Sequence, residues 1–208
     1  MILKKGGINR NVMFKYNDQY LELVNKFSYL GIVFTPGRSF KNTLETLSGA
    51  ALKAIFKLKS YLIKFPDLKT SYMLDLFDKL VVPVLSYDSE IWAYTNVDVL
   101  ERICLRFYKH VLGITLQSQT IFVHGELGTR PIKNKLIVNM IRYWIKVVNM
   151  NDNKYVTMVY NMLLNDLQIN ENKMSWVSGI RNTLQSLGLN DAWIFQTVGN
   201  KTLFLELV

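Results

Sequence analysis

The sequence has few of the residues from which many functional sites are built. Its 208 residues include one cysteine, Cys104, and two histidines, His110 and His124. A single cysteine excludes an internal disulfide and fits a reducing compartment. The cysteine and the histidines lack the spacing of a zinc site. No apolar run approaches the roughly 20 residues that a membrane-spanning helix needs, so we expect no membrane partner.

Motifs of several enzyme classes are also missing. There is no GxGxxG motif, no Walker-type phosphate loop and no adjacent pair of aspartates. Asp75 and Asp78 are three residues apart on an expected helix and could hold a divalent cation, but no third ligand accompanies them. His124 and Glu126 could perform acid–base chemistry in a hydrolase, but no serine or cysteine nucleophile motif accompanies them. We therefore predict that this chain, as it stands, is not an enzyme and holds no metal or cofactor.

Positive charge is concentrated in the first third of the chain. The formal net charge is +9 at neutral pH. Residues 1–64 contain 11 lysines and arginines and 3 acidic residues, whereas residues 65–208 contain 14 basic and 13 acidic residues. This asymmetry is typical of contact with a polyanion, although a basic surface that only aids solubility would give the same pattern.

The first part of the chain has strand patterns. Residues 12–25 predict a β-hairpin whose turn is Asn17-Asp18. Residues 27–34, FSYLGIVF, predict a third strand. Its central Gly31 is unusual inside a strand and indicates a bulge, or the close approach of a ligand or another backbone.

From Ser39 onward the apolar residues recur with a helical period. Ser39 is a suitable N-cap, and the helix is expected to end before Pro66. Six apolar residues at helical spacing predict its buried face: Leu44, Leu47, Ala51, Ile55, Leu58 and Leu62. Lys53, Lys57 and Lys64 lie on the opposite side, and we call these three residues the lysine ridge.

More helices are predicted in the remainder of the chain. They cover residues 70–82, 96–112, 134–150, 154–167 and 173–188, with a less regular stretch over 117–131 and a C-terminal segment over 191–208. We therefore predict a mainly α protein, in which a small N-terminal antiparallel β-hairpin region precedes a multi-helix region. Within the helical region, a boundary between two parts of the chain is expected near Asp152-Asn153, where several polar residues lie together.

Several segments, in this order, resemble one family. They are KKGG (4–7), FSYLGIVF with TPGRSF (27–40), LFDKLVVPVLSYDSEIWA (76–93), RFYKHVLGI (106–114), VHGELGTRPI (123–132) and IRYWIKVV (141–148). They resemble the region downstream of the catalytic palm in the reverse transcriptases of LINE-type (non-LTR) retrotransposons, which are RNA-directed DNA polymerases. The resemblance spans nearly the whole chain and rests on the order and spacing of the segments.

The resemblance implies a division of the chain into three parts. Residues 1–38 would be a primer-grip-like hairpin remnant of the palm, residues 39–150 a thumb-like helical region, and residues 151–208 a C-terminal helical extension. The palm, with the paired aspartates that hold the catalytic Mg²⁺ ions of the family, would precede Met1. Without it we expect no polymerase activity from this chain. The resemblance also implies a nuclear location.

The resemblance assigns nucleic-acid contacts to two places. Tyr29, Leu30 and Gly31 correspond to the hairpin that approaches the 3′ end of the nascent DNA, where a glycine would allow a close approach. Lys41 and the lysine ridge would lie along the template–primer duplex and contact its backbone without sequence preference.

Four positions depart from the family pattern. The family usually has glycine at Asp88 and at Ala93, and arginine at Thr129. Arg38 replaces a common glycine. We transfer no role to Asp88 or Thr129, and the departures fit a diverged copy of the element.

Two functions therefore remain open at this point. The first is binding of an RNA–DNA or DNA duplex through the basic N-terminal third. The second is an inert or protein-interaction helical module without a nucleic-acid function, whose tryptophans serve only as core and interface. Self-association through exposed apolar surface is expected in the second case.

Overall fold

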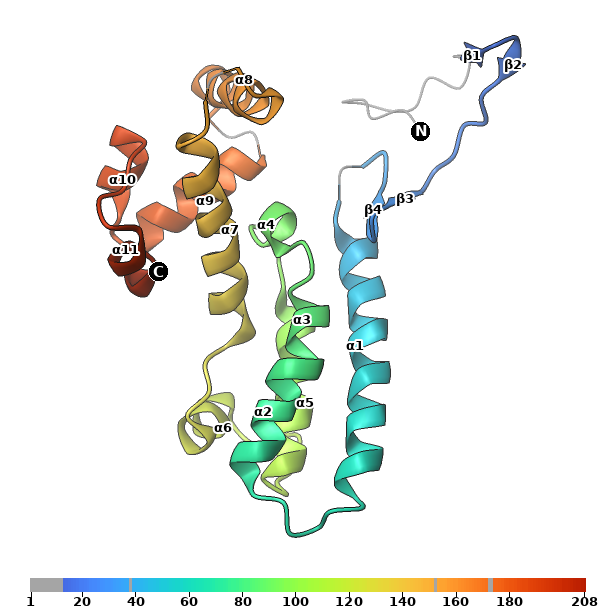
Figure 1. Ribbon diagram of the computed structural model, residues 1–208, viewed down its shortest axis with the longest axis vertical. Coiled ribbons are helices and arrows are strands. Elements are labelled where there is room, and N and C mark those ends of the chain that lie inside the picture. The colour runs from blue at the N-terminus through green and yellow to red at the C-terminus, as the bar shows by residue number, and fades with distance from the viewer. Residues whose placement is uncertain (1–12, 38, 152, 172–173) are drawn as a thin grey trace.

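The computed structural model describes residues 13–37, 39–151, 153–171 and 174–208. Two small hairpins come first, and helices form the rest (Figure 1). β1 (Lys15–Tyr16) pairs antiparallel with β2 (Gln19–Tyr20), and β3 (Phe27–Tyr29) pairs antiparallel with β4 (Ile32–Phe34). The predicted fold class, mainly α with a small N-terminal antiparallel β region, is therefore confirmed. The KKGG segment and Arg38 lie outside the described residues.

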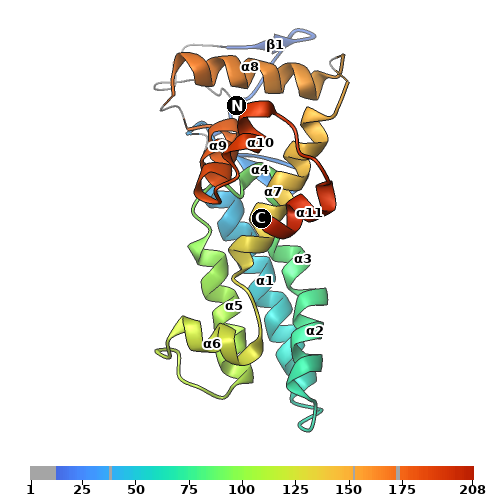
Figure 2. The same ribbon diagram turned by 90° about the vertical axis from the view of Figure 1, so that its left-hand side faces the viewer.

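The helices form an elongated bundle. Their bounds are α1 Lys41–Leu62, α2 Thr70–Leu80, α3 Val82–Leu85, α4 Ser89–Trp92, α5 Asp98–Val111, α6 Thr120–Leu127, α7 Ile132–Val148, α8 Tyr155–Ile169, α9 Trp176–Ser186, α10 Asn190–Phe195 and α11 Lys201–Leu207. α1 forms one edge of the bundle and packs on α2, α3 and α5. α8 lies crosswise over one end (Figure 2). Among the described residues, no helix has the length and hydropathy of a membrane span.

Residues 27–34 form a hairpin and not a single strand. The turn is Leu30-Gly31, with φ angles of +48° and +84°, as in the type I′ turns of two-residue hairpins. The expectation of one continuous strand is therefore wrong. Gly31 occupies the turn because glycine adopts a positive φ without steric cost. The first hairpin turns at Asn17-Asp18, as predicted, also with positive φ.

α1 packs through the face that the sequence predicts. All six residues of the predicted apolar stripe are buried. The helix ends at Leu62, before Pro66, as expected. It begins at Lys41, with Phe40 rather than Ser39 as its N-cap. The Ser39 Oγ still accepts a hydrogen bond from the Lys41 N–H, at 3.2 Å.

Two other predicted boundaries differ from the structure. The expected helix over 70–82 is interrupted, because α2 ends at Leu80 and Pro83 lies in the first turn of α3. Proline suits that position, where its missing N–H would have no helical partner. The stretch 117–131 is not irregular throughout but contains α6, which ends at Leu127 and has Gly128 as its C-cap, with a φ of +61°.

Aromatic side chains fill much of the core. Phe77 of α2 and Phe107 of α5 stack with 4.4 Å between their ring centroids. The buried Trp144 of α7 donates its indole N–H to the Tyr160 hydroxyl of α8 at 2.8 Å. The Tyr160 hydroxyl in turn donates to the Gln196 Oε1 at 2.6 Å. This chain of bonds satisfies the polar atoms of large buried rings and fixes the inner face of α8 to α7.

Candidate nucleic-acid interface

The lysine ridge lies along the free side of α1. Lys53, Lys57 and Lys64 are exposed. Lys53 and Lys57 lie on the side of α1 opposite its buried face, and Lys64 lies in the turn two residues beyond the end of the helix. At 100° per residue, Lys53 and Lys57 lie about 40° apart around the axis. At 1.5 Å per residue, α1 rises about 14 Å from Lys53 to its last residue, Leu62. Two ammonium groups are therefore presented on one side of α1, and a third lies just beyond its end.

No carboxylate neutralises the ridge within the described part of the chain. Glu45 is the one acidic residue of α1 and lies two turns before Lys53. The ion pairs found among the described residues involve other side chains. The Lys64 ammonium lies over the Tyr61 ring, 5.8 Å from its centroid, which is a weak contact at an exposed site. The positive charge of the ridge is therefore available to a polyanion.

Two other lysines of α1 lie off the ridge. Lys41 is exposed at the start of the helix, but it lies at least about 120° around the axis from the ridge residues. The structure therefore does not bring Lys41 and the ridge onto one face. Lys59 is half-buried, and desolvation lowers its pKa. Burial lowers the pKa of the neighbouring His110, and the charge of Lys59 lowers it further.

The sequence analysis missed the apolar and small residues beside the ridge. Phe56 is 70% exposed on the outer side of α1. Gly49 and Ala50 are also exposed there, and no heavy atom lies within 4 Å of a Cβ built at Gly49. The helical wheel contains the signal, since Phe56 falls on the polar side, where the core does not require it.

The β3–β4 hairpin is attached to the bundle at two points. The buried Thr43 Oγ1 accepts a hydrogen bond from the Val33 N–H at 3.0 Å and donates one to the Val33 carbonyl at 3.2 Å. The Tyr87 hydroxyl donates to the Leu30 carbonyl at 3.0 Å. A Cβ at Gly31 would lie 3.0 Å from the Tyr87 ring. The close approach that this glycine allows is therefore to a side chain of the same protein.

The tip of this hairpin is exposed and strained. Tyr29 and Leu30 both project into solvent, and Leu30 is 69% exposed. A leucine at positive φ costs on the order of 1 kcal/mol, and such strain is concentrated at functional sites. The hairpin is bonded to Thr43 in the first turn of α1, whereas the ridge begins at Lys53, in the second half of the helix. The structure thus separates the two predicted contact regions along one helix.

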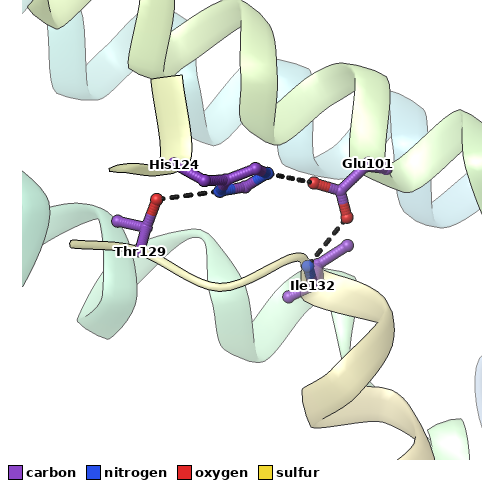
Figure 3. Close-up of polar contacts among 4 residues, drawn as sticks. All are labelled: Glu101, His124, Thr129 and Ile132. Carbon is purple, nitrogen blue, oxygen red and sulfur yellow. Dashed lines mark hydrogen bonds and ion pairs between the residues drawn. The ribbon is translucent and has the colours of Figure 1, made fainter. Parts of the chain in front are cut away.

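His124 does not pair with Glu126 as the hydrolase hypothesis requires. Its Nε2 lies 3.2 Å from the Glu101 Oε1 and its Nδ1 lies 3.0 Å from the Thr129 Oγ1 (Figure 3). The other oxygen of Glu101 accepts the Ile132 N–H at 2.8 Å. A carboxylate at the first turn of α7 stabilises the N-terminus of that helix. Since each nitrogen and oxygen has a structural partner, we interpret the cluster as a joint between α5, α6 and α7.

The two aspartates of α2 are not arranged as metal ligands. Asp75 forms an ion pair with Lys79 at 2.7 Å. Burial raises the pKa of Asp78, the Lys135 charge lowers it, and Asp75 raises it. The described residues contain no cluster of three or more His, Cys, Asp or Glu side chains suited to a metal ion.

Two chemically notable side chains are buried in α5. Burial, together with Glu101 and Asp78, raises the pKa of the Cys104 thiol, so the thiol is a poor nucleophile. The ammonium of the buried Lys109 donates hydrogen bonds to the carbonyls of Leu116 at 2.6 Å and Ser118 at 2.7 Å. Lys109 therefore holds the loop between α5 and α6 and contributes little to the surface charge.

Comparison of the chain with known protein families, with curated proteins and with solved structures finds no match. The case for a function therefore depends on the geometry and charge described above, together with the resemblance of individual segments. Of these, the lysine ridge is the feature with the clearest chemical preference.

Proposed function

We propose that this chain binds a nucleic-acid duplex through the lysine ridge, as the thumb-like part of a non-LTR reverse transcriptase. The observation that carries the proposal is the ridge itself. Two exposed lysines lie on the free side of a helix whose other face is packed into the core, and a third exposed lysine follows just beyond the end of that helix. Lysines at such spacing neutralise successive phosphates, which gives affinity without sequence preference.

The shape of α1 supports the same proposal. Next to the ridge, Gly49 has no side chain and Ala50 has only a methyl group, and both are exposed. A sugar–phosphate backbone can therefore approach the helix closely at this point. In this proposal Phe56 contacts the sugars or the groove of the duplex, as an apolar side chain among phosphate-binding lysines.

The backbone at Asp88 also supports the resemblance. Asp88 has a φ of +49°, a left-handed conformation for which glycine is the usual residue. The related reverse transcriptases usually have glycine at this position. Aspartate tolerates the conformation better than most residues, so the departure from the family pattern leaves this turn possible.

The hairpin tip has a second role in the proposal. Tyr29, Leu30 and Gly31 would contact the end of the nascent strand. Because these 208 residues contain no adjacent pair of aspartates that could hold the catalytic metal ions, we propose binding without polymerisation by the residues described here, and a nuclear location.

The test is binding of the purified chain to a labelled RNA–DNA hybrid of about 20 base pairs, at several salt concentrations. We expect an affinity that falls steeply with salt, because bound phosphates release counterions. We also expect little change when the sequence of the duplex is altered. A folded protein that does not bind at low salt would refute the proposal.

The alternative, a protein-interaction module, is favoured by the first hairpin. Apolar side chains are exposed on and beside β1 and β2, namely Met13, Phe14, Tyr16, Tyr20 and Leu21. An isolated two-stranded hairpin is marginally stable in water. A protein surface that covers it would therefore stabilise it, whether that surface is an upstream palm or another chain.

A further inference from the structure

Helix α8 is apolar on two opposite faces. Its inner face, which includes Tyr160 and Leu167, is buried. Its outer face exposes five large apolar side chains: Tyr155, Met158, Val159, Met162 and Ile169. We call these five residues the α8 stripe. At 100° per residue they lie within about 100° of one another around the axis, along a helix about 22 Å long.

The stripe is placed where a second protein can reach it. α8 lies across one end of the bundle, away from the free side of α1 (Figures 1 and 2). Tyr155 and Val159 also line an apolar pocket of about 400 Å³, together with Ile91, Val156 and Trp176. A helix that lies on the stripe would therefore also cover the mouth of this pocket.

The charges of α8 indicate what kind of partner fits. The helix contains one charged residue, Asp166, and no cation that would attract a nucleic acid. Exposed residues of opposite charge lie at its two ends: Lys154 immediately before the helix and Glu171 two residues after it. An apolar stripe with a positive residue at one end and a negative residue at the other is complementary to itself when two copies run antiparallel.

We propose that α8 is a homodimer interface, in which the stripe of one copy packs antiparallel on the stripe of a second copy. With Met162 at the twofold axis, Tyr155 lies opposite Ile169 of the second copy. The same register brings Lys154 close to Glu171 of the second copy, and the symmetry produces this ion pair twice. The pairing also aligns the two helix dipoles in opposite directions, which is favourable.

The area of the stripe is sufficient for a weak, specific dimer. Tyr155 is 87% exposed and Ile169 is 79% exposed, and the other three side chains are about half exposed. For side chains of this size the stripe presents roughly 600 Å² per copy, so a symmetric pair would bury about 1,200 Å². This is the lower limit of stable interfaces, and we expect dissociation constants on the order of micromolar.

The first experiment measures the molar mass of the full chain by light scattering over a range of micromolar concentrations. We expect a concentration-dependent shift towards twice the mass of the monomer. Met162→Glu should leave the protein monomeric at every concentration, because it places two carboxylates at the twofold axis. Asn161→Glu is the matched control, since it adds the same charge to an exposed position of α8 away from the stripe.

Charge reversal distinguishes this interface from any other apolar contact. Lys154→Glu alone and Glu171→Lys alone place like charges opposite each other twice, and each should weaken dimerisation several-fold. The double variant restores opposite charges and should return the dissociation constant to near its original value. A contact through the exposed hairpins would not show this rescue.

A cross-linking experiment tests the register. Met162→Cys should form a disulfide between two copies under mild oxidation, whereas Asn161→Cys should not. The native Cys104 is buried and does not interfere. The proposal is overturned if the chain is monomeric throughout, if Met162→Glu still dimerises, or if the charge-reversed double variant behaves like the single ones. A circular dichroism spectrum equal to that of the wild type shows that each variant is folded.

Discussion

Removal of the three ridge lysines should weaken duplex binding by an amount that can be calculated from the structure. The triple variant Lys53→Gln, Lys57→Gln, Lys64→Gln removes three charges and keeps three long polar side chains. The side chains are exposed and form no ion pair among the described residues. The change in folding stability should therefore stay within about 0.5 kcal/mol.

The expected effect follows from counterion release. The ridge begins at Lys53, about 14 Å before the end of α1, and continues to Lys64 beyond that end, so the three lysines can reach three different phosphates. Each neutralised phosphate contributes about 0.9 to the slope of log affinity against log salt, so the variant should lose up to about 2.7 of the slope. Between 50 and 200 mM salt, a slope of about 2.7 corresponds to roughly a 40-fold change in affinity.

The assay is fluorescence anisotropy with a labelled hybrid duplex at four salt concentrations in that range. The matched control is Lys133→Gln, Lys146→Gln, Lys201→Gln, which removes three exposed lysines from α7 and α11. Both variants have the same net charge, so a general effect of charge would be equal in the two. The reasoning is refuted if the ridge variant keeps the wild-type slope, or if the control loses as much of it.

Three further predictions concern stability and are tested by urea unfolding. Thr43→Val should cost about 1–3 kcal/mol, because it leaves the N–H and the carbonyl of Val33 without their partner, whereas Thr43→Ser, which keeps the hydroxyl, should cost less. Gly31→Ala should cost at least about 1 kcal/mol, because φ is +84° and the new Cβ meets the Tyr87 ring; no loss would contradict the turn geometry. Burial raises the pKa of Tyr160 to about 12, above the value of about 10 in an unfolded chain. Its contribution to stability should be complete below pH 10 and be lost between pH 10 and 12, where the unfolded state binds fewer protons. Tyr160→Phe should show a smaller fall in stability over that range, and an equal fall would contradict the assignment.

The pattern of apolar residues predicted α1 well, since a helix with one buried face repeats its apolar residues every three or four positions. Leu44 to Leu62 illustrate this, and all six stripe residues are buried. The same pattern was misleading at residues 27–34. There the β-branched and aromatic residues favour strand on both sides of Gly31, and a turn with leucine at its first position lacks the usual Asn-Gly signal.

The contacts between distant parts of the chain could not be predicted. Glu101 lies 23 residues before His124, and no local pattern connects the two. Tyr87 lies 57 residues after Leu30, and only the packing of the hairpin against the bundle brings them together. The positions of Lys53 and Lys57 around α1 follow from spacing alone, whereas the joint at His124 depends on the tertiary structure.

The sequence of α8 contains the apolar residues of both its faces, but the sequence analysis did not predict that one of these faces is exposed. A helix with apolar residues on all sides is typical of a buried position, and α8 could be taken for one. The structure shows that other elements cover only one side of α8. Which side is covered depends on the neighbouring elements and cannot be read from the sequence of the helix.

The buried Lys109 has a consequence for how this chain tolerates mutation. Its ammonium binds the backbone carbonyls of Leu116 and Ser118, and every amino acid provides such a carbonyl. The side chains of this loop can therefore be exchanged without loss of the two bonds. Position 109 cannot be exchanged so freely, because a neutral replacement would leave two acceptors without a donor. In a lineage that accumulates substitutions, the loop between α5 and α6 would therefore keep its conformation while its sequence changes, provided that Lys109 is retained.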